Sequence, residues 1–465
     1  MDGVMADSAR SLLSTFLDAL GISSPTPEIE LSVGGSLPSV FAVSDLAQAS
    51  IGAAGGALSA MMSIDSDSVP EVRVNRDLAS AWFGSSIRPQ GWKMPAPWDS
   101  VSGDYRCSDG WIKLHANAPR HRAVILEVLG VPGDYEAVSR AAAAWSAHEL
   151  ETAVVVAGGA AAAMRTVAQW REHPQGQLVT REPLVTLTRT STTDDHATTF
   201  GSPDRPLERV RVLDLTRVLA GPVATRLLAG WGAEVLRIDS PDWDEPAIIP
   251  EVGLGKRCAR LDLRSPDGLE RFLELLSATD VLVHGYRADA LDRLGLGSDI
   301  RDAVRPGLVD VSLDAYGWAG PWRNRRGFDS LVQMSSGIAD AGRVCSGADK
   351  PVPLPVQALD HATGYLMAAS ALTGLSLRKS DGVGSHWRTS LARMAELLIT
   401  TSDGGNSLVS TIDVPESTGP IEHTSWGDAR RLAPPLEVVG APLRWTIPAH
   451  ELGSDEPAWS RSRAH

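Results

Sequence analysis

Apolar and polar positions along the chain alternate in two different rhythms. Residues 5–21 carry apolar side chains at helical spacing and predict a helix that ends at Gly21. Later, short β-branched runs alternate with helical segments. Strands are predicted over 210–215, 233–238, 259–263, 280–284 and 308–313, and helices over 222–229, over 265–277 and from about Ala288. Strands joined by crossover helices pair in parallel, so an open α/β sheet is predicted. Such sheets bind ligands beyond the carboxyl ends of their strands.

Two stretches far apart in the chain share one pattern. Each has Leu-Pro, a short apolar run, a single aspartate and a helix of small residues; the aspartates are Asp45 and Asp360. We interpret them as a degenerate internal repeat with a period near 315 residues. Aspartate is a favoured N-cap, so helix capping is the ordinary interpretation of both side chains. A nucleophilic role for Asp360 is the alternative.

The region between the two rhythms predicts a smaller module. Residues 105–114 have the pattern of a hairpin, with Asp109-Gly110 in its turn, and helices are expected around 119–129, 146–156 and 166–172. The organisation predicted from these patterns has four parts. They are a helical segment with the partial repeat (1–85), a small α+β domain (86–185), a linker rich in Thr, Ser, Asp and Pro (186–206), and an α/β domain with a C-terminal tail (207–465).

Charge and cysteine content narrow the class of protein. A net charge of −14 disfavours nucleic acid as the main partner, because phosphate backbones need clustered Lys and Arg. The three cysteines have neither disulfide-framework nor zinc-site spacing, which predicts no metal and a reducing, cytoplasmic setting. The start of the chain has no basic region of a signal peptide, and the longest apolar run, 152–164, is too short to span a bilayer. We expect a protein without a membrane partner.

The first strand-to-helix loop of the α/β region carries no nucleotide motif. It lacks G-x-G-x-x-G, and no GxxxxGK[ST] occurs, which disfavours NAD, FAD and nucleoside triphosphates. Cationic and aromatic residues stand near the predicted strand ends instead: Arg264, Tyr286, Arg287, Arg293 and Arg326. Such a set suits a phosphorylated ligand held by side chains. The alternative is that these arginines only solvate the surface.

Several of these segments together resemble one family. The class III CoA-transferases have similar motifs in the same order along their chains. The segments that resemble them here are residues 212–222 with 232–238, 256–264, 280–287 and the Gly327-Phe328-Asp329 triplet. The family includes formyl-CoA transferase, carnitine CoA-transferase and α-methylacyl-CoA racemase. The resemblance covers about residues 206–395. Residues 105–183 are similar to the family's small domain, which normally follows the aspartate helix, so the resemblance implies two incomplete copies with reordered domains.

The resemblance implies a reaction and a set of residues. Asp360 falls on the nucleophilic aspartate, which forms an acyl anhydride and then an aspartyl-CoA thioester, before an acceptor carboxylic acid takes the CoA. Acyl-CoA and coenzyme A are substrates, and no permanently bound cofactor is implied. The resemblance also implies a homodimer. By family position, the residues that line the CoA site are Ala220, Leu261, Arg264, Tyr286, Arg287, Arg293, Arg326 and Asp329.

Two other functions stay open. A racemase needs an acid–base pair. Racemases of the family have histidine where this chain has Phe328, which counts against this function, and the alternative base is His361. The incomplete copies alternatively indicate a non-catalytic subunit that binds acyl-CoA.

Overall fold

One large sheet organises the molecule. The computed structural model describes residues 2–22, 27–66, 68–192, 200–402, 408–414 and 419–460. The strands of the sheet lie in the order β10 (Lys256–Arg260), β9 (Glu234–Asp239), β8 (Arg211–Leu215), β11 (Val281–His284), β12 (Val309–Asp314), β13 (Val383–Ser390) and β7 (Thr186–Thr192). All neighbours are parallel except β7, which pairs antiparallel with β13. The predicted open α/β class with a parallel sheet is confirmed.

The strand order reverses direction between β8 and β11. The chain runs outward from β8 to β9 and β10, then returns to place β11 on the other side of β8. Loops that leave neighbouring strands in opposite directions open a crevice at their carboxyl ends. The helices that follow the strands are α9 (Ala220–Gly230), α10 (Ile249–Val252), α11 (Pro266–Ser277) and α12 (Ser298–Val304). The crevice is therefore expected beyond Leu215 and His284.

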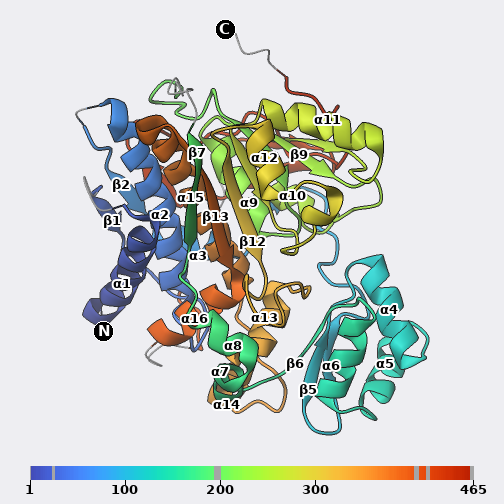
Figure 1. Cartoon of the computed structure of the whole chain (residues 1–465). Helices are drawn as coiled ribbons and strands as arrows, with labels where there is room; N and C mark the ends of the chain where they lie inside the picture. Colours follow the sequence, from blue (N-terminus) through green and yellow to red (C-terminus); the bar gives the residue numbers. More distant parts are fainter. Residues whose placement is uncertain are drawn as a thin grey trace.

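The two helices of the internal repeat lie side by side. They are α2 (Val43–Met62) and α15 (Ala358–Asp381), drawn at the left of Figure 1. Both share one hydrophobic core with α1 (Asp2–Leu20) and α9. A Cβ added at Gly364 would lie 2.4 Å from the Ala220 carbonyl oxygen, so α15 packs on α9 at a distance that only glycine permits. This contact holds the first turn of α15 against the first strand-to-helix loop of the sheet.

A smaller α+β module lies at the lower right of Figure 1. Strands β4 (Gly103–Arg106), β5 (Trp111–Leu114) and β6 (Ala161–Ala163) form its sheet, with a hydrophobic cluster of its own. Its helices are α4 (Pro119–Leu129), α5 (Tyr135–Ala142) and α6 (Ala147–Val156). The side chains of Trp170, Val179 and Leu184 pack in the large core instead. The hairpin and the helices predicted between 105 and 156 are thus present.

The remaining elements extend the core and the edges. Two small sheets have the orders β1 (Ile29–Leu31), β2 (Val72–Val74), β16 (Leu436–Val438) and β14 (Glu422–Thr424), β15 (Gly427–Arg431), β3 (Ile87–Pro89). Each joins the amino-terminal part of the chain to its carboxyl-terminal tail. The other helices are α3 (Arg76–Trp82), α7 (Val167–Glu172), α8 (Pro174–Val179), α13 (Asp329–Ser336), α14 (Ile338–Ser346) and α16 (Leu391–Thr401), with short 3₁₀ turns at Ser63–Asp65 and Asp292–Leu294.

The structure differs from the predicted elements in three places. Residues 186–192 of the predicted linker form the edge strand β7, because their backbone pairs with β13; residues 193–199 lie outside the described part. Strand β10 begins at Lys256, three residues before the prediction. No α-helix begins at Ala288: a turn leads to the 3₁₀ segment Asp292–Leu294, and α12 starts only at Ser298.

Candidate active site

The entry into α15 has an unusual backbone. The N-cap is Gln357, with φ −76° and ψ 65°, and its neighbours close a tight turn in which the Ala358 N–H donates to the Val356 carbonyl at 2.8 Å. These are the features of an inverse γ-turn. Asp360 is therefore the third residue inside the helix and not its cap, which corrects the capping interpretation. The same correction applies to Asp45, since α2 starts after the N-cap Ala42.

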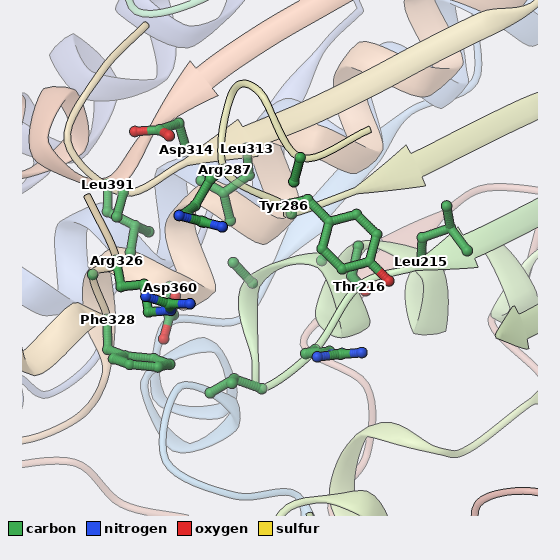
Figure 2. A pocket seen from close by; sticks show the side chains of 18 of the residues that line it. Leu215, Thr216, Tyr286, Arg287, Leu313, Asp314, Arg326, Phe328, Asp360 and Leu391 are labelled. Carbon is green, nitrogen blue, oxygen red and sulfur yellow. The ribbon is translucent and has the colours of Figure 1, made fainter. Parts of the chain in front are cut away.

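The Asp360 side chain is buried yet faces a cavity (Figure 2). Within the described residues, no hydrogen bond or ion pair to its carboxyl group is present. Burial raises the pKa of Asp360 well above the ordinary value, and the nearby Asp329 carboxylate raises it further. The result is a carboxyl group that holds its proton more strongly than a surface aspartate and has no internal partner to satisfy it.

Asp329 holds the backbone of Asp360. Its Oδ2 accepts the Asp360 N–H at 2.9 Å, and its Oδ1 accepts the side-chain amide of Gln333 at 2.5 Å. Gln333 in turn accepts the Leu354 N–H at 2.7 Å. A carboxylate at the first turn of a helix satisfies free N–H groups and interacts favourably with the helix dipole. Burial raises the pKa of Asp329 to about 6. This residue fixes where the Asp360 side chain starts.

The cavity before Asp360, named here the Asp360 cavity, has a volume of about 310 Å³. It opens at the carboxyl ends of three neighbouring parallel strands: Leu215 is the last residue of β8, Leu313 is the next to last of β12, and Tyr286 follows β11. In Figure 2, Asp360, Arg326 and Phe328 lie on one side and Tyr286 and Thr216 on the other. It lies at the topological switch point, as expected for an open α/β sheet.

A second cavity adjoins the first. The Arg264 cavity, of about 280 Å³, is lined by residues that follow β9, β10 and β11, Arg264 among them. Both cavities are lined by Arg217, Tyr286 and Ala290, so they lie side by side, and the pair is called the groove here. An extended ligand fits such a groove better than a compact one.

The residues predicted to contact CoA divide into four groups. Ala220, Tyr286, Arg287 and Arg326 line the Asp360 cavity, and Leu261 and Arg264 line the second cavity together with Tyr286. Arg293 lines neither cavity; it pairs with Asp289 at the surface. Asp329 also lines neither cavity and lies buried behind Asp360, where it accepts the bonds described above.

Four arginines line the Asp360 cavity: Arg217, Arg287, Arg325 and Arg326. The charges of Arg287 and Arg120, together with burial, lower the pKa of Arg326, which places these cations close together. The guanidinium of Arg217 lies 4.2 Å from the ring centroid of Trp243 and 5.6 Å from that of Tyr286. Its Nη2 donates to Ser240 at 3.0 Å, and stacking on the rings leaves the rest of the guanidinium available to a phosphate. Arg217 was not predicted, because its position in the first loop carries no motif.

Two more residues of the groove were not predicted. His121, from α4 of the small module, lines the Asp360 cavity; burial and the charges of Arg326 and Arg120 lower its pKa to about 4. Val218 has φ 64°, and its N–H donates to Glu245 at 2.9 Å. A positive φ in a β-branched residue is strained and is stabilised only by its surroundings. Neither feature has a signal in the sequence, since one arises from domain packing and the other from backbone conformation.

His361, considered as a substitute base, lies away from the cavity. Its ring stacks on Phe83 with centroids 5.0 Å apart, it is 1% exposed, and burial lowers its pKa to about 3. Phe328 fills the cavity wall, with the His115 ring stacked on it at 3.9 Å. A neutral, enclosed imidazole has no access to a substrate.

Two further features are absent from the described part of the chain. No group of three or more His, Cys, Asp or Glu side chains is arranged to hold a metal ion. None of its helices combines the length and apolar character needed to cross a membrane.

The fold and site define an α/β protein with an unpaired carboxyl group at the end of an arginine-lined groove. Residues 207–425 match the model of CoA-transferase family III. This match covers a little under half of the chain.

Relatives match in part of their length. A probable fatty acyl-CoA transferase of Mycobacterium tuberculosis (Rv3272) is 31% identical over 196 residues, 39% of this chain and 49% of the relative. The succinyl-CoA:glutarate CoA-transferase of Mus musculus is 34% identical over 193 residues, 39% of this chain and 44% of the relative. An acyl-CoA transferase of Gibberella moniliformis is 27% identical over 352 residues, 70% of this chain and 60% of the relative. The chain thus spans about half the length of these curated relatives. A crystal structure of Rv3272 has 30% identity and covers 42% of this chain and 57% of its own, with a TM-score of 0.40.

Proposed function

We propose that the protein transfers CoA from an acyl-CoA to a carboxylic acid through a covalent intermediate on Asp360. One observation carries the proposal: a buried carboxyl group without an internal partner faces a cavity at the carboxyl ends of the parallel strands. A structural aspartate at that depth is normally paired or hydrogen-bonded. The family match supports the choice of acyl-CoA as donor.

Each step balances atoms and charge. The Asp360 carboxylate attacks the thioester carbon, the C–S bond breaks, and CoA thiolate leaves an aspartyl anhydride. The thiolate then attacks the aspartyl carbonyl and releases the first acid as its carboxylate. An acceptor carboxylate attacks the resulting aspartyl-CoA thioester, and thiolate attack on the new anhydride gives the new acyl-CoA and free Asp360. Covalent catalysis of this kind divides one difficult transfer into easier ones.

The raised pKa of Asp360 has a role in this scheme. A carboxylate of higher pKa is a stronger base, and a weakly solvated one is less shielded from the thioester. Its acylation is expected to speed up as the pH rises through the pKa of Asp360. The backbone grip of Asp329 keeps the nucleophile in one place during successive attacks.

The groove offers matching sites for coenzyme A. The phosphates of coenzyme A suit the guanidinium groups of Arg217, Arg264, Arg287 and Arg326. The adenine ring of coenzyme A suits stacking on Tyr286 and Trp243. An extended ligand in the two adjacent cavities directs its thioester end toward Asp360. This assignment modifies the prediction from the family resemblance, because Arg217 joins the set and Arg293 and Asp329 leave it.

The racemase alternative has less support. Its candidate base, His361, is enclosed beside Phe83, and Phe328 occupies the wall position. Exchange of the substrate's α-hydrogen for deuterium without an acceptor acid would favour racemisation. A non-catalytic subunit would bind acyl-CoA without forming an adduct.

Trapping the intermediate tests the proposal. The purified protein is incubated with acetyl-CoA or succinyl-CoA, and peptides are analysed by mass spectrometry with and without hydroxylamine. We expect a hydroxamate at Asp360 in the wild type and none in Asp360→Asn. Asp45→Asn is the matched control, since it changes the corresponding residue of the other repeat helix. Absence of any adduct, or an adduct that persists in Asp360→Asn, contradicts the proposal.

A further inference from the structure

A row of polar residues crosses the centre of the large sheet. His284, Ser312 and Arg388 are direct neighbours in the register of β11, β12 and β13. One pair further back, Asp310 lies beside His386 in the same register. Side chains two apart on a strand share a face, so all five point to the same side. An interior sheet face is normally apolar, and this row therefore requires an explanation.

The row forms the floor of a third pocket, named here the His284 pocket. Its volume is about 70 Å³, enough for a few water molecules or one small ion. Arg301, from α12, donates to Asp310 Oδ2 through two nitrogens at 2.8 and 2.6 Å. His284 Nε2 lies 3.2 Å from Asp310 Oδ1. The Asp310 charge is thus already neutralised by groups of the floor.

One residue of the floor lacks hydrogen-bond partners. His284 is only 7% exposed, and among the described residues neither of its ring nitrogens has a hydrogen-bond partner, although Nε2 lies 3.2 Å from Asp310 Oδ1. A buried ring nitrogen left unpaired destabilises the fold by about 1–3 kcal/mol. Nε2 lies toward Asp310, so a neutral ring carries its proton there and presents Nδ1 as an acceptor for a water or a ligand hydroxyl.

The rim of the His284 pocket is cationic. Arg287 and Arg388 line it, and neither has a carboxylate partner among the described residues. Arg388 lies over the ring of Trp318, 5.0 Å from its centroid, which holds the guanidinium at the opening. His386 is engaged with Asp302 at 2.8 Å, so its side chain adds no free acceptor. Asp292 is the one carboxylate of this lining that has no cationic partner among the described residues, and it is exposed.

We propose that the His284 pocket binds a small oxyanion, a phosphate or a short carboxylate, between the guanidinium groups of Arg388 and Arg287. The two arginines supply charge and fork-shaped donors, and the floor supplies a polar surface that has no fixed negative charge left to repel an anion. A cation is disfavoured, because the acidic side chain of the floor is already engaged with Arg301 and His284. A neutral ligand would leave both arginines without a counter-charge.

The site is separate from the Asp360 cavity but shares one wall with it. Arg287 lines both, whereas Asp360 and Arg326 line only the first and Arg388 only the third. An anion in the His284 pocket competes with a ligand of the Asp360 cavity for the Arg287 guanidinium. The binding itself does not depend on acyl transfer.

Calorimetric titration of the full chain tests the proposal. Sodium phosphate and sodium acetate are titrated at constant ionic strength, with sodium chloride as the reference. We expect saturable binding of at least one oxyanion, weakened at least about tenfold in Arg388→Gln, since a charge-assisted bond contributes about 1.5–3 kcal/mol. The phosphate and acetate arms show which of the two is preferred. Because Arg388 is exposed, its variant is expected to fold, which circular dichroism verifies.

Two controls locate the ion. Arg323→Gln removes an equal charge from an exposed side chain that lines none of the three pockets, and it should bind as the wild type does. Arg326→Gln alters only the Asp360 cavity and should also retain binding. The proposal is overturned by three results: no saturable binding beyond chloride, unchanged binding in Arg388→Gln, or loss confined to Arg326→Gln, which places the ion beside Asp360.

Discussion

The helices α2 and α15 carry the same aspartate in the same backbone setting and in opposite environments. Their N-caps, Ala42 (φ −74°, ψ 54°) and Gln357 (φ −76°, ψ 65°), are followed by equal tight turns, with N–H to carbonyl distances of 2.8 Å in both. Asp45 and Asp360 are each the third helical residue. The repeat inferred from the sequence thus extends to the local geometry of the helix start.

The partners of the two aspartates differ. Asp45 accepts from Arg76 at 2.7 Å, and both side chains are almost completely buried. Arg76 also donates to the Gly35 carbonyl and to Ser36, which leaves the charge fully enclosed. Asp360 faces a cavity where Asp45 faces an arginine, and the like charge of Asp329 lies close enough to raise the pKa of Asp360. The same residue at the same helix position is therefore structural in one copy and a candidate nucleophile in the other.

The largest expected effect separates the two in activity. Asp360→Asn should lower CoA transfer at least about 10⁴-fold, because the variant has no nucleophilic oxygen for the first step. Asp45→Asn should keep most of the activity. Transfer from acyl-CoA to a panel of carboxylic acids, followed by chromatography, measures both. Equal losses in the two variants would remove the functional distinction.

The second-largest expected effect is on the free energy of unfolding, which distinguishes variants of Asp45 from variants of Asp360. Asp45→Ala leaves Arg76 buried without its partner and should lower the free energy of unfolding by about 3–5 kcal/mol. Urea unfolding followed by circular dichroism measures this change. A loss below about 1 kcal/mol would show that water or another group compensates the Arg76 charge.

Asp360→Asn should raise the free energy of unfolding, the opposite of the effect of Asp45→Ala. Because the folded pKa of Asp360 is raised above the unfolded value, the folded state binds more protons, and wild-type stability falls as the pH rises from about 4 toward the folded pKa. The neutral amide avoids this loss. We expect the variant to be more stable at pH 8 by about 1–3 kcal/mol, the usual penalty of an unsatisfied buried group. The difference should shrink near pH 4, and a constant difference would contradict this origin.

Asp329→Asn tests the electrostatic link. It retains an oxygen that accepts the Asp360 N–H but removes the charge that raises the pKa of Asp360. The rise of the acylation rate with pH should therefore shift to lower pH, by more than about half a unit. Stopped acylation reactions between pH 4 and 9, read by mass spectrometry, give the profile. A lower rate with an unshifted profile would assign Asp329 a purely structural role.

The smallest effect concerns the loop across the cavity. Val218→Gly relieves the positive φ and should change stability by about 1 kcal/mol or less, since the gain from relieved strain is partly offset by the chain entropy of glycine. Thermal unfolding measures it. A loss of several kcal/mol would instead show that the Val218 side chain is needed for packing.

Much of the fold was predictable because its signals are local. β-Branched runs alternating with capped helices predict a parallel sheet wherever they occur, and Ser265 with Pro266 begins α11 as its sequence indicates. Failures came where tertiary pairing overrode composition. The polar stretch 186–192 has the composition of a linker and becomes β7, because the exposed edge of β13 pairs with its backbone.

The candidate site divides in a similar way. Motif order directed attention to Asp360, Tyr286, Arg287 and Arg326, and the structure brings these four to one cavity. Motif order could not separate Asp329, which is buried behind Asp360, from the residues that line the groove. Arg217, His121 and Val218 were missed, because their roles come from a stacked ring, another module and a strained dihedral angle.

The sequence by itself determined the sheet and the two aspartates at equal positions of two helices, since these follow from patterns read along the chain, and it indicated the family that residues 207–425 match. Only the tertiary structure decided which aspartate is neutralised and which faces a cavity. That difference depends on charges and volumes contributed by segments distant in sequence, Arg76 in one case and Asp329 with the strand-end loops in the other. Electrostatic environment is a property of the folded neighbourhood, and no local pattern encodes it.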